Sequence, residues 1–268
     1  MKKGKIGILS FVLIATIAIN CGPGGNPFIS QVENGIGAGD YETALAATDS
    51  ILAQNPDSPL AYYYRGEVYV NKANKNPEVG AREGDYETAR ENYVKAIEIN
   101  NSLEEEQKVG EINDAPKKMT FYWGQEHNAA INIATDDSLG LDPASLQTAA
   151  DHLKNAIAIS PDTVFSYEVL AEVYRRLERY EEGARYMQMA VDKKDPALPE
   201  DYNRLSVFYS ISDQNDKNVL ALEEALELYP LERSKKHGLL LVLNCLAWLQ
   251  RAGTASGLGM CGRTGTKV

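Results

Sequence analysis

Apolar and small residues recur through the middle of the chain with the spacing of amphipathic helices. The stretches GDYETALAATDSILAQNPDS, from Gly39, and GDYETARENYVKAIEINNS, from Gly84, begin with the same letters and continue with the same apolar spacing. A third stretch, RYEEGARYMQMAVDKKDP from Arg179, follows a similar pattern. Apolar residues at i, i+3, i+4 and i+7 predict an amphipathic helix in each stretch. An amphipathic helix that recurs along a chain indicates a repeat protein whose units bury one another.

The full pattern resembles the tetratricopeptide repeat (TPR), a unit of about 34 residues that forms a helix hairpin. The unit that starts at Val164 has large residues at Tyr167 and Tyr174 and a small residue at Ala171, as the family has at these positions. Another unit starts near Pro199. The resemblance implies an all-α fold, a TPR superhelix of stacked antiparallel helix hairpins, because one hairpin cannot bury its apolar face alone.

About five TPR-like units are expected over residues 28–232, and two of them carry insertions. In the unit near Pro59 the segment NKANKNPEVGA delays the second helix. In the unit that ends at Pro161 an insertion separates the two helices, and Asp142 and Pro143 open the second helix as N-cap and first helical residue. Most of the 15 tyrosines fall on positions that fill the space between helices, so we expect them in the core and not in a ligand cage.

The N-terminus has the pattern of a secretory signal. The basic start MKKGK precedes the uncharged run IGILSFVLIATIAI, which is shorter than the roughly 20 residues that a spanning helix needs. The run ends in AINC, which resembles the lipobox of bacterial lipoproteins. Ala18 and Asn20 depart from the Leu and the Gly or Ala that are usual in that box. The alternatives are ordinary secretion and an uncleaved anchor.

The lipobox resemblance implies a signal peptide over residues 1–20 and lipidation of Cys21. The following GPGGNP predicts a flexible tether over residues 21–27. Enterobacterial lipoproteins that stay in the inner membrane have Asp where this chain has Gly22. We therefore expect the protein in the bacterial cell envelope, held by its N-terminal lipid in the outer membrane and facing the periplasm.

Composition and motifs narrow the classes of function. The formal charge of −11 does not suit nucleic acid, which requires a basic surface. The three histidines are scattered without the spacing of a metal site, and motifs for nucleophiles, phosphate loops or dinucleotides are lacking. We therefore expect no catalytic residue, no metal, no cofactor and no enzyme activity.

In TPR proteins the first helix of each unit lines a concave groove, and the resemblance assigns partner-binding positions here. These positions hold Tyr63, Glu67, Asn71, Phe165, Glu168, Glu172, Arg175, Asn203 and Phe208. They lack the Lys and Asn with which chaperone-binding relatives hold a terminal carboxylate. So many acids favour a neutral or basic segment, and the alternative for each charge is a solvated helix face.

The C-terminal residues 233–268 differ from the repeats. All 38 acidic residues come before Ser234, and the end contains an apolar run, GLLLVLNCLAWL, followed by Gly and Thr. One interpretation is an apolar helix that caps the last hairpin, followed by a Gly-rich tail. The other is a frameshifted or truncated end that has lost a sixth repeat.

The leading hypothesis is a lipid-anchored, non-enzymatic TPR scaffold for protein–protein interactions in the bacterial envelope. Its partner would be an unidentified protein or peptide and not a nucleic acid. The alternative is a ligand-capture lipoprotein of an uptake system, which would bind a sugar or a peptide. Starch-binding relatives of that type are much longer. An enzyme is the third hypothesis, since an acidic chain always offers pairs of carboxylates.

Overall fold

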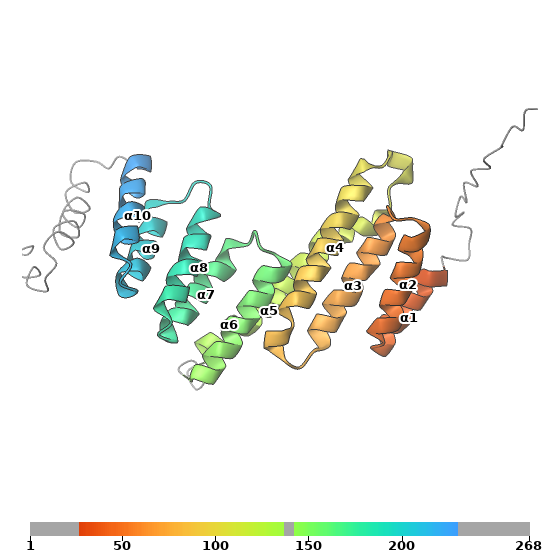
Figure 1. Ribbon diagram of the computed structural model, residues 1–268, viewed down its shortest axis with the longest axis horizontal. Helices are drawn as coiled ribbons and strands as arrows, with labels where there is room; N and C mark the ends of the chain where they lie inside the picture. Colours follow the sequence, from red (N-terminus) through yellow and green to blue (C-terminus); the bar gives the residue numbers. More distant parts are fainter. Residues whose placement is uncertain (1–26, 137–141, 230–268) are drawn as a thin grey trace, which may run out of the picture.

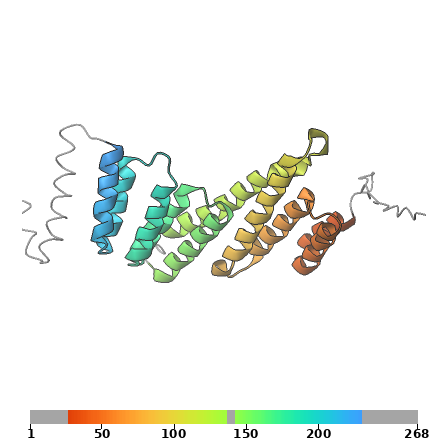
Figure 2. The same cartoon turned by 45° about the horizontal axis from the view of Figure 1, so that its top comes forward.

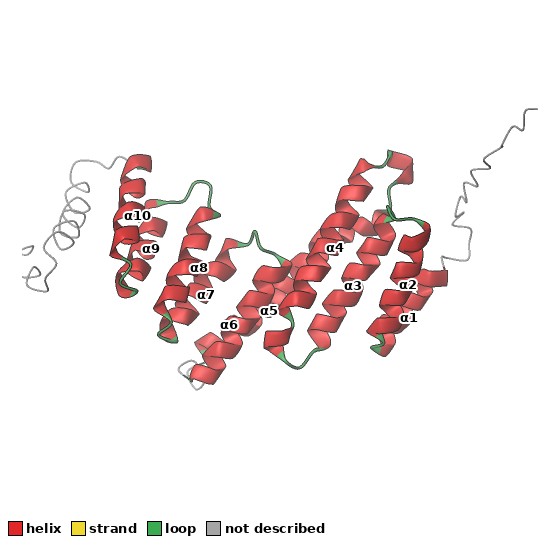
Figure 3. Ribbon diagram, viewed as in Figure 1, coloured by secondary structure: helices red, strands yellow, loops and turns green. Residues whose placement is uncertain are grey.

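The computed structural model describes residues 27–136 and 142–229, and these residues form helices and no strand (Figure 3). The α-helices are α1 (Pro27–Ala38), α2 (Tyr41–Gln54), α3 (Pro59–Lys75), α4 (Glu83–Ser102), α5 (Ala115–Thr135), α6 (Pro143–Ile159), α7 (Val164–Arg176), α8 (Tyr180–Asp192), α9 (Pro199–Ile211) and α10 (Asn215–Leu228). Three short 3-10 helices are η1 (Val79–Ala81), η2 (Glu105–Gln107) and η3 (Gly110–Asp114). The predicted signal peptide, Cys21 and the segment 233–268 lie outside the described residues. Of the predicted tether only Pro27 is described, and it is the first residue of α1.

Consecutive helices pair into antiparallel hairpins, and the hairpins stand side by side in chain order (Figure 1). The hairpins are α1–α2, α3–α4, α5–α6, α7–α8 and α9–α10. The larger contacts between elements all join partners within one hairpin or in adjacent hairpins. Turning the row by 45° shows the two described ends at opposite ends of the molecule (Figure 2). The predicted all-α fold of stacked antiparallel helix hairpins is confirmed.

Small residues let neighbouring helices approach closely, both within a hairpin and between hairpins, as the repeat pattern requires. A Cβ added to Gly66 in α3 would lie 2.8 Å from ring atoms of Tyr93 in α4. A Cβ added to Gly183 in α8 would lie 3.0 Å from the ring of Phe208 in α9. The tyrosines at the large positions fill the space that remains, and Tyr86, Tyr93 and Tyr174 are buried, as expected.

Side-chain caps fix several helix starts. Asp142 accepts a hydrogen bond from the backbone N–H of Ser145 at 2.9 Å, and Pro143 is the first residue of α6, as the sequence predicts. Ser58 caps α3 in the same way by accepting from Ala61 N–H. Each cap satisfies a backbone donor that the first helical turn leaves free.

The middle hairpins are longer than those that follow. Helices α4 and α5 have 20 and 21 residues, against 13 in α7, α8 and α9. The segment NKANKNPEVGA extends α3 to Lys75 and then forms the connection that contains η1. None of the described helices is both long and apolar enough to cross a membrane.

The linker between the second and third hairpins, residues 103–114, is fastened to α4. The buried Asn100 side chain accepts from Val109 N–H at 2.8 Å and donates to Val109 C=O at 3.3 Å. Ile112 of the linker is also buried, in the core cluster that contains Tyr86 and Tyr93. These contacts hold η3 against α3 and α4. No periodic pattern of apolar residues predicts a structure for this linker.

Candidate protein-binding surface

A cavity of about 390 Å³, here called the acidic cavity, lies where α1, α3, η3 and the start of α5 meet. Its aromatic and charged walls are Tyr63, Tyr64 and Glu67 of α3, Glu33 of α1, Glu111 and Asp114 of η3, and Lys118 of α5. Of the predicted groove residues, it brings together Tyr63 and Glu67. The linker supplies two of its carboxylates, so the fastened linker is a wall of the cavity.

Hydrogen bonds hold most of these side chains in place. Glu67 accepts from the Tyr93 hydroxyl at 2.6 Å and from Lys118 Nζ at 3.0 Å. Glu33 accepts from the Tyr64 hydroxyl at 3.0 Å. These bonds join α1, α3, α4 and α5 around one space and hold Glu33 and Glu67 in position, whereas Glu111 and Asp114 are exposed at its rim.

Tyr63 is only 7% exposed, and its ring meets that of Tyr64 edge to face at 5.5 Å. Burial raises the pKa of Tyr63 to about 12, and the negative charges of Glu67, Asp114 and Glu111 act in the same direction. Three carboxylates that oppose ionisation of one phenol indicate a negative potential inside the cavity.

A second group of predicted residues lies on α7. Glu168 binds Lys194 Nζ at 2.7 Å and pairs with Arg204 at 3.3 Å, and Lys194 also contacts Asp201. Glu172 accepts from Arg175 Nε at 2.8 Å, which lowers the pKa of Glu172. Both acids are therefore paired with cations, so this part of the row offers a partner less unbalanced charge than the acidic cavity.

Arg175 also borders a hollow of about 460 Å³, here called the apolar hollow. Its other walls are Tyr180 of α8 and Val207 and Ile211 of α9. Val207 is 56% exposed. Large apolar side chains that stay in solvent beside a hollow are typical of a surface that binds another protein.

The remaining predicted groove residues are placed separately. Asn71 donates to its own helix at Glu67 C=O, and Asn203 is exposed. Phe165 is exposed, with its ring 5.5 Å from that of His127. Phe208 does not line a groove: it is buried and packs against the backbone at Gly183. It occupies a core position because Gly183 leaves room for a ring between α8 and α9.

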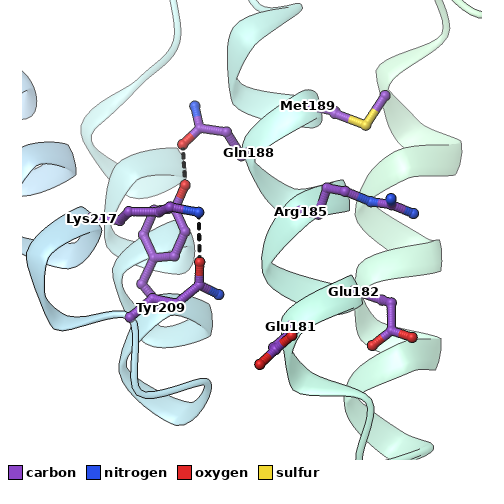
Figure 4. A pocket seen from close by; sticks show the side chains of 8 residues that line it. Glu181, Glu182, Arg185, Gln188, Met189, Tyr209 and Lys217 are labelled. Atoms are coloured by element: carbon purple, nitrogen blue, oxygen red, sulfur yellow. Dashed lines mark hydrogen bonds between the residues drawn. The ribbon is translucent and has the colours of Figure 1, made fainter.

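A third hollow, of about 530 Å³, opens between α8 and the last hairpin (Figure 4). Tyr209 of α9 donates to Gln188 of α8 at 2.6 Å, and Lys217 donates to Gln214 at the start of α10 at 2.7 Å. Its charged residues are Glu181, Glu182, Arg185 and Lys217. Two negative and two positive side chains balance, so the charge of this hollow does not favour a ligand of either sign.

Two buried polar groups resemble parts of catalytic sites. Ser166 Oγ lies 3.0 Å from His127 Nδ1 and accepts from Trp123 Nε1 at 2.9 Å, but Ser166 is fully buried, so a substrate has no access to its oxygen. Glu126 is also buried, among hydrogen-bond donors from α4, α6 and the residues before α4. Within the described ranges, no cluster of His, Cys, Asp and Glu is arranged to hold a metal ion.

Sequence reasoning missed the contributions of α5 and of the linker. Helix α5 buries Glu126 and His127, and polar residues at core positions hide the apolar period that would have marked a repeat helix. Glu111 and Asp114 lie in a linker without a periodic pattern. The only sequence signal for these two residues is the high density of acidic residues in the linker.

No family model matches the sequence, and no curated protein is recognisably similar to it. Several solved structures of TPR proteins are similar to this chain. The P58(IPK) TPR domain is 14% identical with a TM-score of 0.41, and the match covers 84% of this chain and 64% of that one. The match to MamA has 17% identity and a TM-score of 0.31, and covers 75% and 88%. The match to TTC0263, a TPR protein of Thermus thermophilus, has 20% identity and a TM-score of 0.31, and covers 80% and 99%. This chain thus spans less than two thirds of the P58(IPK) domain.

Proposed function

We propose that this protein is a non-enzymatic scaffold that binds a segment of a partner protein along the first helices of its hairpins. The observation that carries the proposal is that predicted groove residues border hollows at both ends of the row. Tyr63 and Glu67 line the acidic cavity, and Arg175 borders the apolar hollow. A segment in contact with both would span several hairpins, which is how stacked repeats gain affinity from shallow sites.

We further propose that the scaffold is attached to the bacterial outer membrane by lipid on Cys21 and faces the periplasm. The support is the sequence alone: a basic start, a short apolar run, a box that ends in cysteine and a Gly- and Pro-rich continuation. An anchored scaffold would hold its partner at the membrane without chemistry of its own.

Photo-crosslinking in the native host tests the binding surface. We expect p-benzoylphenylalanine at position 207, in the apolar hollow, to give a defined adduct with one partner. The matched control is position 220 on α10, where Leu220 is 63% exposed but borders none of the three hollows. The same adducts at both positions, or no adduct at 207, would contradict the proposal.

Intact mass of the protein from native membranes tests the anchor. We expect loss of residues 1–20 together with the added mass of acyl chains, and we expect Cys21→Ala to abolish both changes. An unmodified Cys21 in the mature chain would refute the lipid anchor and leave the binding surface unaffected.

A further inference from the structure

We propose that the acidic cavity binds the guanidinium group of an arginine side chain, presented by the partner protein. The inference rests on the proposed scaffold function and names the chemistry that one of its sites recognises. It goes beyond the general preference of an acidic groove for basic segments, because it assigns one side chain to one cavity.

The net negative charge of the cavity favours binding of a cation. Its walls hold four carboxylates and one ammonium group, which gives a formal charge of −3. Lys118 is bound to Glu67, and Lys117 pairs with Asp114 in solvent. Glu33 and Glu111 have no cationic partner among the described residues. A bound cation would relieve this imbalance, and because two of the carboxylates are exposed to solvent the attraction should weaken at high salt.

Tyr63 adds a second observation. It is more than nine tenths buried and lines the cavity, yet its hydroxyl has no hydrogen-bond partner within residues 27–136 and 142–229. The hydroxyl oxygen is not among the fully enclosed unpaired polar atoms of these residues, so it is open to the cavity and free to bond to a ligand there. Its ring and that of Tyr64 also offer aromatic faces, which attract cations.

The arrangement favours arginine over lysine. Glu33 of α1 and Glu111 of η3 line the cavity together with Tyr64, whose hydroxyl donates to Glu33 at 3.0 Å. Two carboxylates from different elements therefore border the same space as the tyrosine ring. A planar guanidinium can donate to separate acceptors at once and stack on a tyrosine ring, whereas an ammonium is a compact point charge.

Saturation-transfer NMR with the full-length protein tests the proposal directly. The probe is N-acetyl-arginine amide, and its neutral isostere N-acetyl-citrulline amide is the control ligand. We expect saturation of the arginine probe, loss of that signal at high salt, and none for the citrulline probe. Equal signals from both probes would show that the cavity does not distinguish a charged ligand from a neutral one, and would contradict the proposal.

Single substitutions then locate the site. We expect Glu111→Gln, at an exposed position, to weaken binding of the arginine probe about tenfold, and Tyr63→Phe to weaken it about threefold. The matched control is Glu106→Gln, which removes the same charge from the same linker at a position outside the cavity wall. Equal effects of Glu106→Gln and Glu111→Gln would overturn the assignment. If the arginine probe does not bind but cross-linking at position 207 succeeds, the assignment of this cavity is refuted while the scaffold function stands.

Discussion

At the scale of single residues, the least expected feature is a carboxylate in the core. Glu126 accepts from Arg82 at 3.1 Å, Tyr86 at 2.8 Å, His152 at 2.6 Å and Asn155 at 3.2 Å. Burial raises the pKa of this carboxyl, but the hydrogen bonds from His152 and Tyr86 outweigh burial, and the pKa lies below its ordinary value of 4.5. The charged form is thus favoured in the folded protein.

We expect Glu126→Gln to lower the free energy of unfolding by about 3–5 kcal/mol, because the substitution leaves the partly buried Arg82 without its counter-charge and turns an amide N–H toward other donors. A group whose folded pKa is depressed stabilises the fold above its unfolded pKa, and this contribution is lost as pH falls through the folded pKa. Stability of the native protein should therefore fall below about pH 4.5, and the variant should lack this part of the decline. Urea unfolding from pH 7 to pH 3 measures both. The control is Glu87→Gln, at an exposed ion pair, and an equal loss in the control would contradict the argument.

The same scale shows what a sequence can and cannot predict. Gly66 and Gly183 were predictable, because small residues at fixed repeat positions follow from the close approach of two helices. Glu126 was not, because its partners come from α4, α6 and the residues before α4, and no spacing along the chain reveals them. Phe208 is the reverse case. Its position within the repeat unit predicted a groove residue, but its ring packs against Gly183 in the core.

At the scale of elements, period and caps located most helices. Helix α7 begins at Val164, where the best-matching unit was expected to start, and α6 begins at Pro143 behind its predicted cap. The connections between hairpins could not be predicted in the same way. The path of residues 103–114 depends on Asn100, a polar residue near the end of α4 that a pattern of apolar positions treats as neutral. That path decides where Glu111 and Asp114 lie, and with them half the carboxylates of the acidic cavity.

At the scale of the whole molecule, the contacts are local along the row. The buried residues around Tyr86 and Tyr93 form one cluster, and those around Leu205 form another with no shared member. In such quasi-one-dimensional arrays each hairpin is stabilised by its own packing and by its neighbours, and distant hairpins respond weakly. A partner that ordered one end of the row would leave the other end free to bind independently.

We expect Leu205→Ala to test this locality, because Leu205 is 1% exposed in the last hairpin. The loss of its packing should cost about 2–5 kcal/mol. Hydrogen exchange should then accelerate in α9, α10 and the adjoining α8, while α3 and α4 keep their protection. Leu220→Ala, which removes the same atoms from an exposed position of the same hairpin, should change exchange little. Faster exchange throughout α3 and α4 in the Leu205 variant would show one cooperative unit, and the two ends of the binding surface would then be coupled through the fold.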